Sequence, residues 1–173
     1  MKNDKITFEP RFSFHQRTVL TGFFIISLIG TFNSIPTQSN IFEYLGLMFF
    51  VLLSLILLIL VFSKKGLQKT GEKLYRTISF REIIIFKTRI ELSDRPIVSL
   101  LKFRKTQKFA FVSSANPDQG ESFNVFEIFV LNERHTKRDS VIYFKHKESA
   151  NTAIEFMTKD FALKHEIFSP NFD

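Results

Sequence analysis

The feature that most constrains this chain is a long stretch with almost no charge. From Thr18 to Phe62, 45 consecutive residues carry one charged side chain, Glu43. The first apolar run, Thr18–Ile35, has 18 residues and would rise about 27 Å as a helix, close to the roughly 30 Å hydrocarbon core of a bilayer. The second run, Ile41–Phe62, has 22 residues. Residues 18–62 therefore predict a transmembrane helical hairpin.

The connection between the two runs, Ser34–Asn40, is uncharged and contains Pro36, which is typical of a tight turn. The two helices are therefore expected to be antiparallel neighbours. Basic residues lie before the first span and after the second, and none lies between the two spans. They are Lys2, Lys5, Arg11 and Arg17 before the first span, and Lys64, Lys65, Lys69 and Lys73 after the second. By the positive-inside rule, this pattern places a multi-pass protein in the cytoplasmic membrane with both termini cytoplasmic.

A secretory signal peptide is the alternative interpretation of the first run, with Thr37–Ser39 as a cleavage site. The apolar region is longer than a signal usually needs, and a second span follows at once. Cleavage would leave one span with the same Lys-rich flank, so the C-terminal part would be cytoplasmic in either case.

A four-residue spacing relates Thr18, Gly22, Ile26 and Gly30 in the first run, and Gly46, Phe50 and Ser54 in the second. Each helix therefore has a face on which small residues permit close approach. The candidate helix-packing residues are Gly22, Gly30, Gly46 and Ser54. They serve either the packing of one helix on the other or docking against a further membrane protein. Glu43 is expected near the outer interface, with its carboxylate in water.

Residues 1–17 are expected to form a cytoplasmic juxtamembrane segment, and residues 63–173 a cytosolic domain. Within the first segment, Ile6–Phe14 alternates apolar and polar residues around Pro10. This pattern leaves two structures open: a segment in the headgroup region, or an edge strand added to the cytosolic domain.

Beyond Phe62 the apolar period is close to two, which indicates strands. About seven are expected: Leu67–Lys69, Leu74–Phe80, Ile83–Leu92, Ile97–Arg104, Lys108–Ser114, Phe123–Leu131 (in the middle of the sheet) and Ser140–His146, with turns that include Arg81-Glu82 and Lys105-Thr-Gln107. A helical stripe follows at Ala150, Ile154, Met157 and Phe161, widened by Ala153, Phe156 and Leu163. The fold class is therefore α+β, with a small antiparallel barrel or curled sheet capped by one C-terminal helix.

Lys64-Lys-Gly66 directly after the second run, then Lys73-Leu-Tyr-Arg76 opening a long strand pair, resembles small bacterial two-span membrane proteins that carry a pleckstrin-homology-like domain. The resemblance covers most of the chain and rests on the order of elements. It implies a seven-stranded barrel with one C-terminal helix, and little about function.

Motifs for catalysis are not found: the chain has no G-x-S-x-G, no P-loop, no dinucleotide fingerprint and no H-E-x-x-H. Cys is absent, which excludes a disulfide framework or a thiolate metal site. A turn with Glu133, His135 and Asp139 could bind a cation, and a solvated turn is the alternative. We expect no enzyme, no metal and no cofactor.

Charge is unevenly distributed along the cytosolic part. Residues 64–108 contain thirteen basic and four acidic residues, whereas residues 109–173 contain seven and ten. Anionic lipid attracts such basic segments. The candidate lipid-contact residues are Lys64, Lys65, Lys69, Lys102, Arg104, Lys105 and Lys108. Ordinary solvated residues are the alternative, and tethering to a bilayer argues against nucleic acid as a partner.

The sequence therefore favours a non-enzymatic, membrane-anchored binding or scaffold module. Its cytosolic domain would contact a protein partner or the anionic membrane face. The alternative is an accessory subunit of a larger membrane complex that docks through its transmembrane helices.

Overall fold

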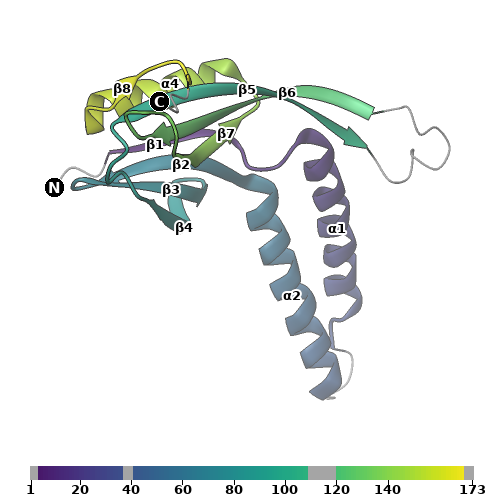
Figure 1. Ribbon diagram of the computed structural model, residues 1–173. Coiled ribbons are helices and arrows are strands. Elements are labelled where there is room, and N and C mark those ends of the chain that lie inside the picture. Colours follow the sequence, from purple (N-terminus) through teal and green to yellow (C-terminus); the bar gives the residue numbers. More distant parts are fainter. Residues whose placement is uncertain (1–3, 37–40, 109–119, 170–173) are drawn as a thin grey trace. The chain divides into compact units, whose positions relative to one another are not determined.

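The computed structural model describes residues 4–36, 41–108 and 120–169, which form three helices and two four-stranded sheets (Figure 1). The expected α+β class is confirmed. The strand order is β1-β2-β3-β4 in the first sheet and β7-β6-β5-β8 in the second. The helices are α1 (Phe14–Asn33), α2 (Ile41–Phe62) and α4 (Lys147–Phe161), and the strands are β1 (Lys5–Pro10), β2 (Ser63–Thr70), β3 (Lys73–Phe80), β4 (Ile83–Ile90), β5 (Ile97–Lys108), β6 (Gly120–Leu131), β7 (Arg138–Phe144) and β8 (Lys164–His165).

The chain forms two compact units. We call Met1–Glu9, Gly66–Thr77 and Lys87–Asp173 the sheet unit, and Pro10–Lys65 with Ile78–Phe86 the helix unit. The division differs from the expected single break near residue 63. The far end of the β3–β4 hairpin, Ile78–Phe86, belongs with the helices, and the segment up to Glu9 belongs with the sheets.

The N-terminal segment is an edge strand, one of the two structures that the sequence left open. The N–H of Arg11 donates to the carbonyl of Ser63 at 3.0 Å, and the N–H of Lys69 donates to the carbonyl of Asp4 at 2.9 Å. Residue numbers rise along β1 as they fall along β2, so the two strands are antiparallel. Both helices are thus inserted in the connection between two paired strands.

Gly66 of β2 lies against the main chain of β1. A Cβ at this position would lie 2.6 Å from the carbonyl oxygen of Ile6 and 2.7 Å from Oγ1 of Thr77. The first of these atoms is backbone and cannot move without shifting β1. Glycine is therefore required here by the close approach of another main chain.

The core of the sheet unit is built around α4, whose apolar stripe is buried as predicted. Ala150, Ala153 and Met157 are fully enclosed and share one core with Leu67 of β2 and Ile128 of β6. Phe126 of the same strand packs against this core. The stripe thus gathers residues from strands that are far apart in the sequence.

Contacts from β1 and the end of β7 extend this core. The ring of Phe8 packs edge-on against Phe144 at 5.0 Å between ring centroids. Next to it, the carboxylate of Glu9 accepts a 2.8 Å hydrogen bond from the N–H of Lys145. Burial lowers the pKa of the Lys145 ammonium, and the charge of Glu9 opposes this effect.

The expected barrel is wrong, because the described strands form two separate sheets. The start of β5 pairs with β6 on one side and with β8 on the other, so it has no free edge for a ladder with β4. The turn between β4 and β5 holds Asp94 in the left-handed region, at φ 58°. The helix α4, rather than a closing ladder, covers the apolar face of the second sheet.

The expected turn at Lys105-Thr-Gln107 is also wrong. The strand β5 continues through it and pairs with β6 from Ile97 opposite Leu131 to Lys108 opposite Gly120. An unbroken ladder of hydrogen bonds outweighs the weak turn preference of three polar residues. As predicted, β6 is a central strand, and Arg81 adopts φ 53° in the turn before β4. The expected strand after Lys108 lies outside the described residues.

The close approach at Gly66 leads to a stability prediction. The change Gly66→Ala should lower the free energy of unfolding by about 1–3 kcal/mol, because the methyl group overpacks against the β1 backbone. Thermal unfolding in mild detergent would measure the loss. The matched control is Gly22→Ala, where an added Cβ has no neighbour within 4 Å. Equal melting temperatures for the two variants would contradict the β1–β2 approach.

Candidate functional site

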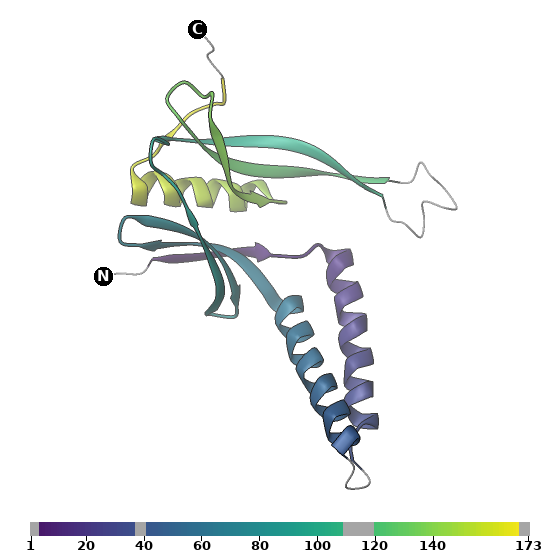
Figure 2. The same cartoon turned by 60° about the horizontal axis from the view of Figure 1, so that its bottom comes forward.

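The helices α1 and α2 lie side by side in both ribbon views (Figures 1 and 2). The hydroxyl of Ser27 lies 2.8 Å from that of Ser54, and both residues are buried. The Ser27 hydroxyl also lies 3.2 Å from the carbonyl oxygen of Phe50. Buried hydroxyl pairs of this kind hold apolar helices together where no water competes.

The four candidate helix-packing residues divide into two groups. A Cβ on Gly30 would lie 2.5 Å from the ring of Phe50, and Ser54 bonds Ser27, so both lie at the contact between α1 and α2. A Cβ on Gly46 would have one neighbour, the hydroxyl of Ser34 at 3.9 Å. By contrast, Gly22 faces open space, in a shallow groove of about 440 Å³ on α1.

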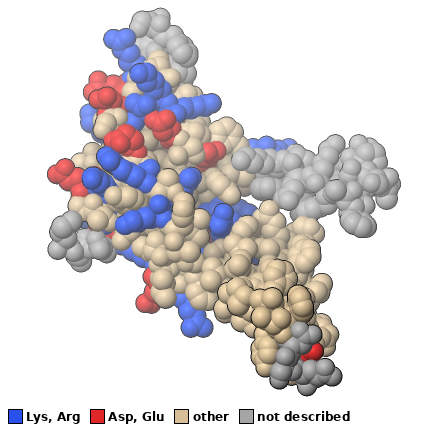
Figure 3. All heavy atoms as spheres, turned by 90° about the horizontal axis from the view of Figure 1, so that it is seen from below, with Lys and Arg blue, Asp and Glu red and all other residues tan. Residues whose placement is uncertain are grey.

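Among the described residues, α2 is the one helix long and apolar enough to cross a membrane, and its most apolar 18-residue stretch has a mean hydropathy of 3.2. Only 17% of its most apolar stretch is buried. The helix α1 does not reach the same level of hydropathy, because its first turn contains His15, Gln16 and Arg17 and its last residue is Asn33. In Figure 3 the helical part is free of Lys and Arg over most of the face in view, whereas blue side chains gather over the sheets.

Two of the candidate lipid-contact residues have roles inside the fold. Lys65 is buried, with 6% of its surface exposed. The ammonium of Lys69 donates to the carbonyl of Asp160 in the last turn of α4 and lies 5.2 Å from the centre of the Phe161 ring. A cation at this position satisfies a free carbonyl and favours the negative end of the helix dipole.

Three of the other candidates, Lys64, Lys102 and Arg104, are exposed. Lys102 and Arg104 are two residues apart on β5, so they share one face of the strand. Lys105 and Lys108 are placed in β5 by their backbone pairing, but their side chains lie outside what the structure describes. The predicted basic surface is thus reduced to three described cations from two different strands.

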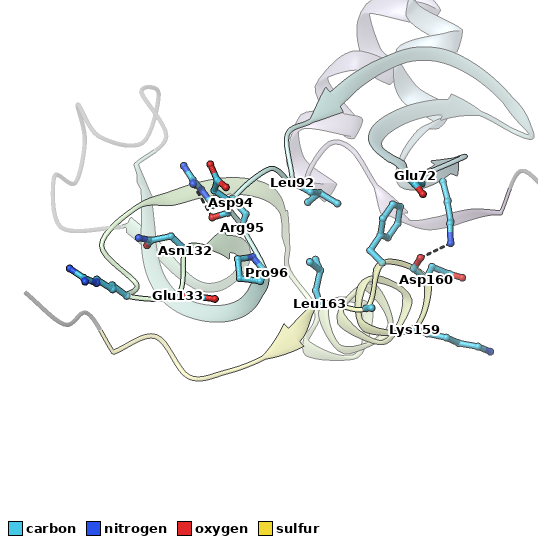
Figure 4. Close-up of a pocket in the computed structure, with 14 residues that line it drawn as sticks. Glu72, Leu92, Asp94, Arg95, Pro96, Asn132, Glu133, Lys159, Asp160 and Leu163 are labelled. Atoms are coloured by element: carbon cyan, nitrogen blue, oxygen red, sulfur yellow. Dashed lines mark hydrogen bonds between the residues drawn. The ribbon is translucent and has the colours of Figure 1, made fainter.

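An open cleft of about 1010 Å³ lies in the sheet unit (Figure 4). Leu92, Pro96 and Leu163 lie in its middle, with charged residues on both sides. One of the cations, Arg95, pairs through Nε with Asp139 at 2.8 Å, and another, Lys69, bonds α4 as described above. Both cations are therefore used to hold turns and a helix end in place.

His135 does not belong to a solvated or cation-binding turn, because its ring is buried and both nitrogens have partners. Its Nδ1 accepts from the N–H of Ser169 at 2.9 Å, so Nε2 carries the proton and donates to Glu166 at 3.2 Å. The ring of Phe168 stacks on the imidazole. His135 thus fixes the segment after α4. In the part of the chain that the structure describes, no cluster of three metal-ligating side chains occurs.

Comparisons with protein-family models, with curated proteins and with solved structures found no match to this chain. Any function has to be argued from the residues themselves, and the resemblance to a pleckstrin-homology-like protein stays a prediction.

The helix contact at Gly30 can be tested against Gly22, which lies two turns away on the same helix. The change Gly30→Ala should lower the melting temperature in mild detergent, because the added methyl group meets the Phe50 ring and separates the helices. The change Gly22→Ala adds the same atom to open space and should have little effect or a small stabilising one. The reverse order of the two variants would contradict the helix contact.

Proposed function

We propose that the protein is a non-enzymatic, membrane-anchored binding or scaffold module of the cytoplasmic membrane. In this proposal α2 crosses the bilayer, and the sheets lie in the cytoplasm together with both termini. The observation that carries it is the surface of α2. This helix has 22 residues, and its most apolar 18-residue stretch has a mean hydropathy of 3.2. It exposes most of its apolar side chains, which is unfavourable in water and favourable in a hydrocarbon core.

The helix α1 would cross the bilayer beside α2. Its apolar side chains Phe23, Ile26 and Ile29 are more than half exposed, as expected for a surface that faces lipid. The buried Ser27–Ser54 contact gives it a partner in the membrane. The antiparallel β1–β2 pairing supports a two-span arrangement, because it brings the start of α1 and the end of α2 to the same end of the pair.

The module would bind either a protein partner or the anionic face of the membrane through its cytosolic part. Lys64 supports the second possibility, because it is exposed and follows the end of α2 by two residues. Exposed basic residues next to a span are attracted to anionic lipid. The resemblance to pleckstrin-homology-like proteins agrees with a binding role.

An accessory subunit that docks through its helices is the second candidate. The observation that favours it is the open groove at Gly22. The other three small residues already have neighbours in the opposite helix or at its end. A helix of another membrane protein could approach α1 closely at this glycine.

The topology leads to a labelling prediction, which is simple to test because the chain has no Cys. In intact cells, an impermeant thiol reagent should label Gln38→Cys. It should label Asn171→Cys only after the cells are permeabilised, because both termini are proposed to be cytoplasmic. Labelling of Asn171→Cys from outside intact cells would contradict the proposed orientation, and labelling of neither residue from outside would contradict the two spans.

The second candidate predicts a different result. The change Gly22→Leu should remove a copurifying membrane partner in mild detergent, because the side chain fills the groove. The same change should leave the contact between α1 and α2 intact, since an added Cβ has no neighbour there. Retention of every copurifying protein by Gly22→Leu would argue for the binding module instead.

A further inference from the structure

The β3–β4 hairpin exposes apolar side chains beside the end of α2. Ile83, Ile85 and Phe86 are 71%, 49% and 60% exposed. They lie on β4, which is the edge strand of the first sheet. An exposed apolar edge strand is a liability in water, because it invites aggregation. Something other than water is therefore expected to cover it.

The end of this hairpin lies beside the last turns of α2, and this position indicates what covers its apolar side chains. Residues Ile78–Phe86 belong to the helix unit rather than to the sheet unit. An apolar groove of about 330 Å³ is lined jointly by Ile59 and Leu60 of α2 and by Ile85 and Phe86 of β4. Side chains from the hairpin and from the last helical turns thus share one continuous apolar surface.

The depth of that surface follows from helix geometry. Ile59 lies three residues before Phe62, the last residue of α2, which is about 4.5 Å along the helix axis. If α2 crosses the bilayer, its last turn lies at the boundary between hydrocarbon and headgroups. The side chains that share a groove with Ile59 and Leu60 must lie at the same level.

The charges around the groove agree with a headgroup region. Exposed Arg11 lines the groove, and exposed Lys64 follows the groove residue Ser63 in sequence. The turn of the hairpin adds one basic and one acidic residue, Arg81 and Glu82, both exposed. Apolar side chains with basic neighbours are typical of segments that lie in the interface of an anionic membrane.

We propose that the end of the β3–β4 hairpin is a second membrane-contact site, with Ile83, Ile85 and Phe86 inserted into the interfacial layer of the cytoplasmic leaflet. The inference rests on the proposed function, since it requires α2 to cross the bilayer. It adds a contact through a strand, which fixes one edge of the first sheet to the membrane surface. The competing occupant is a second copy of the chain, paired along β4.

The test uses the absence of Trp in the chain, so that one introduced Trp gives all of the indole fluorescence. Three full-length single-Trp variants are reconstituted in vesicles of phosphatidylcholine and phosphatidylglycerol: Phe86→Trp, Phe49→Trp on α2, and Tyr143→Trp on β7. Each is exposed to acrylamide in the water and, separately, to lipids brominated near the headgroup or near the chain ends. Phe49 and Tyr143 are both partly exposed aromatic residues, one on the helix and one on the second sheet.

The Trp in Phe86→Trp should lose most of its emission to lipid brominated near the headgroup and be protected from acrylamide. The Trp in Phe49→Trp should respond to the deep bromine, and the one in Tyr143→Trp to acrylamide alone. If position 86 behaves like position 143 while position 49 responds to lipid, the hairpin contact is wrong and the proposed anchor stands. Protection of position 86 from acrylamide without quenching by lipid would assign the edge to a second copy. If position 49 does not respond to lipid, the anchor and the hairpin contact both fail.

Discussion

The antiparallel pairing of β1 with β2 is the interaction on which the rest of the chain depends. It joins a strand before the two helices to a strand after them, through main-chain hydrogen bonds such as that from Arg11 to Ser63. The helices are therefore an insertion in a sheet rather than a separate anchor followed by a domain. For that reason Gly66, which leaves room for the β1 main chain, is important for the whole fold.

In each unit, a polar side chain with a partner helps to hold a helix in place. In the helix unit, Ser27 and Ser54 are buried against each other. In the sheet unit, Lys69 bonds the end of α4, and its ammonium lies over the Phe161 ring. In both cases, the partner reduces the free-energy cost of removing a polar side chain from water.

The proposed membrane contacts differ in what supports them. The spanning role of α2 rests on length and composition, which are properties of one continuous segment. The proposed contact of Phe86 rests on a groove shared by two segments, β4 and the end of α2. The first could be predicted by reading the sequence in order. The second could be predicted only from the tertiary structure, which shows that β4 lies beside the end of α2.

The sequence by itself determined the helices, most strands and the buried stripe of α4, because each follows from local periodicity: Met157 and Ala150 are buried as their spacing predicts. It did not determine how strands combine. Two sheets formed instead of a barrel, and β5 continued through residues with turn preference, since pairing with a distant strand supplies hydrogen bonds that no local pattern records. The same reason applies to the candidate site. Charge could be counted along the chain, but only the tertiary structure decided that Lys65 is buried and that Lys69 bonds a helix end, because exposure depends on contacts between residues far apart in sequence.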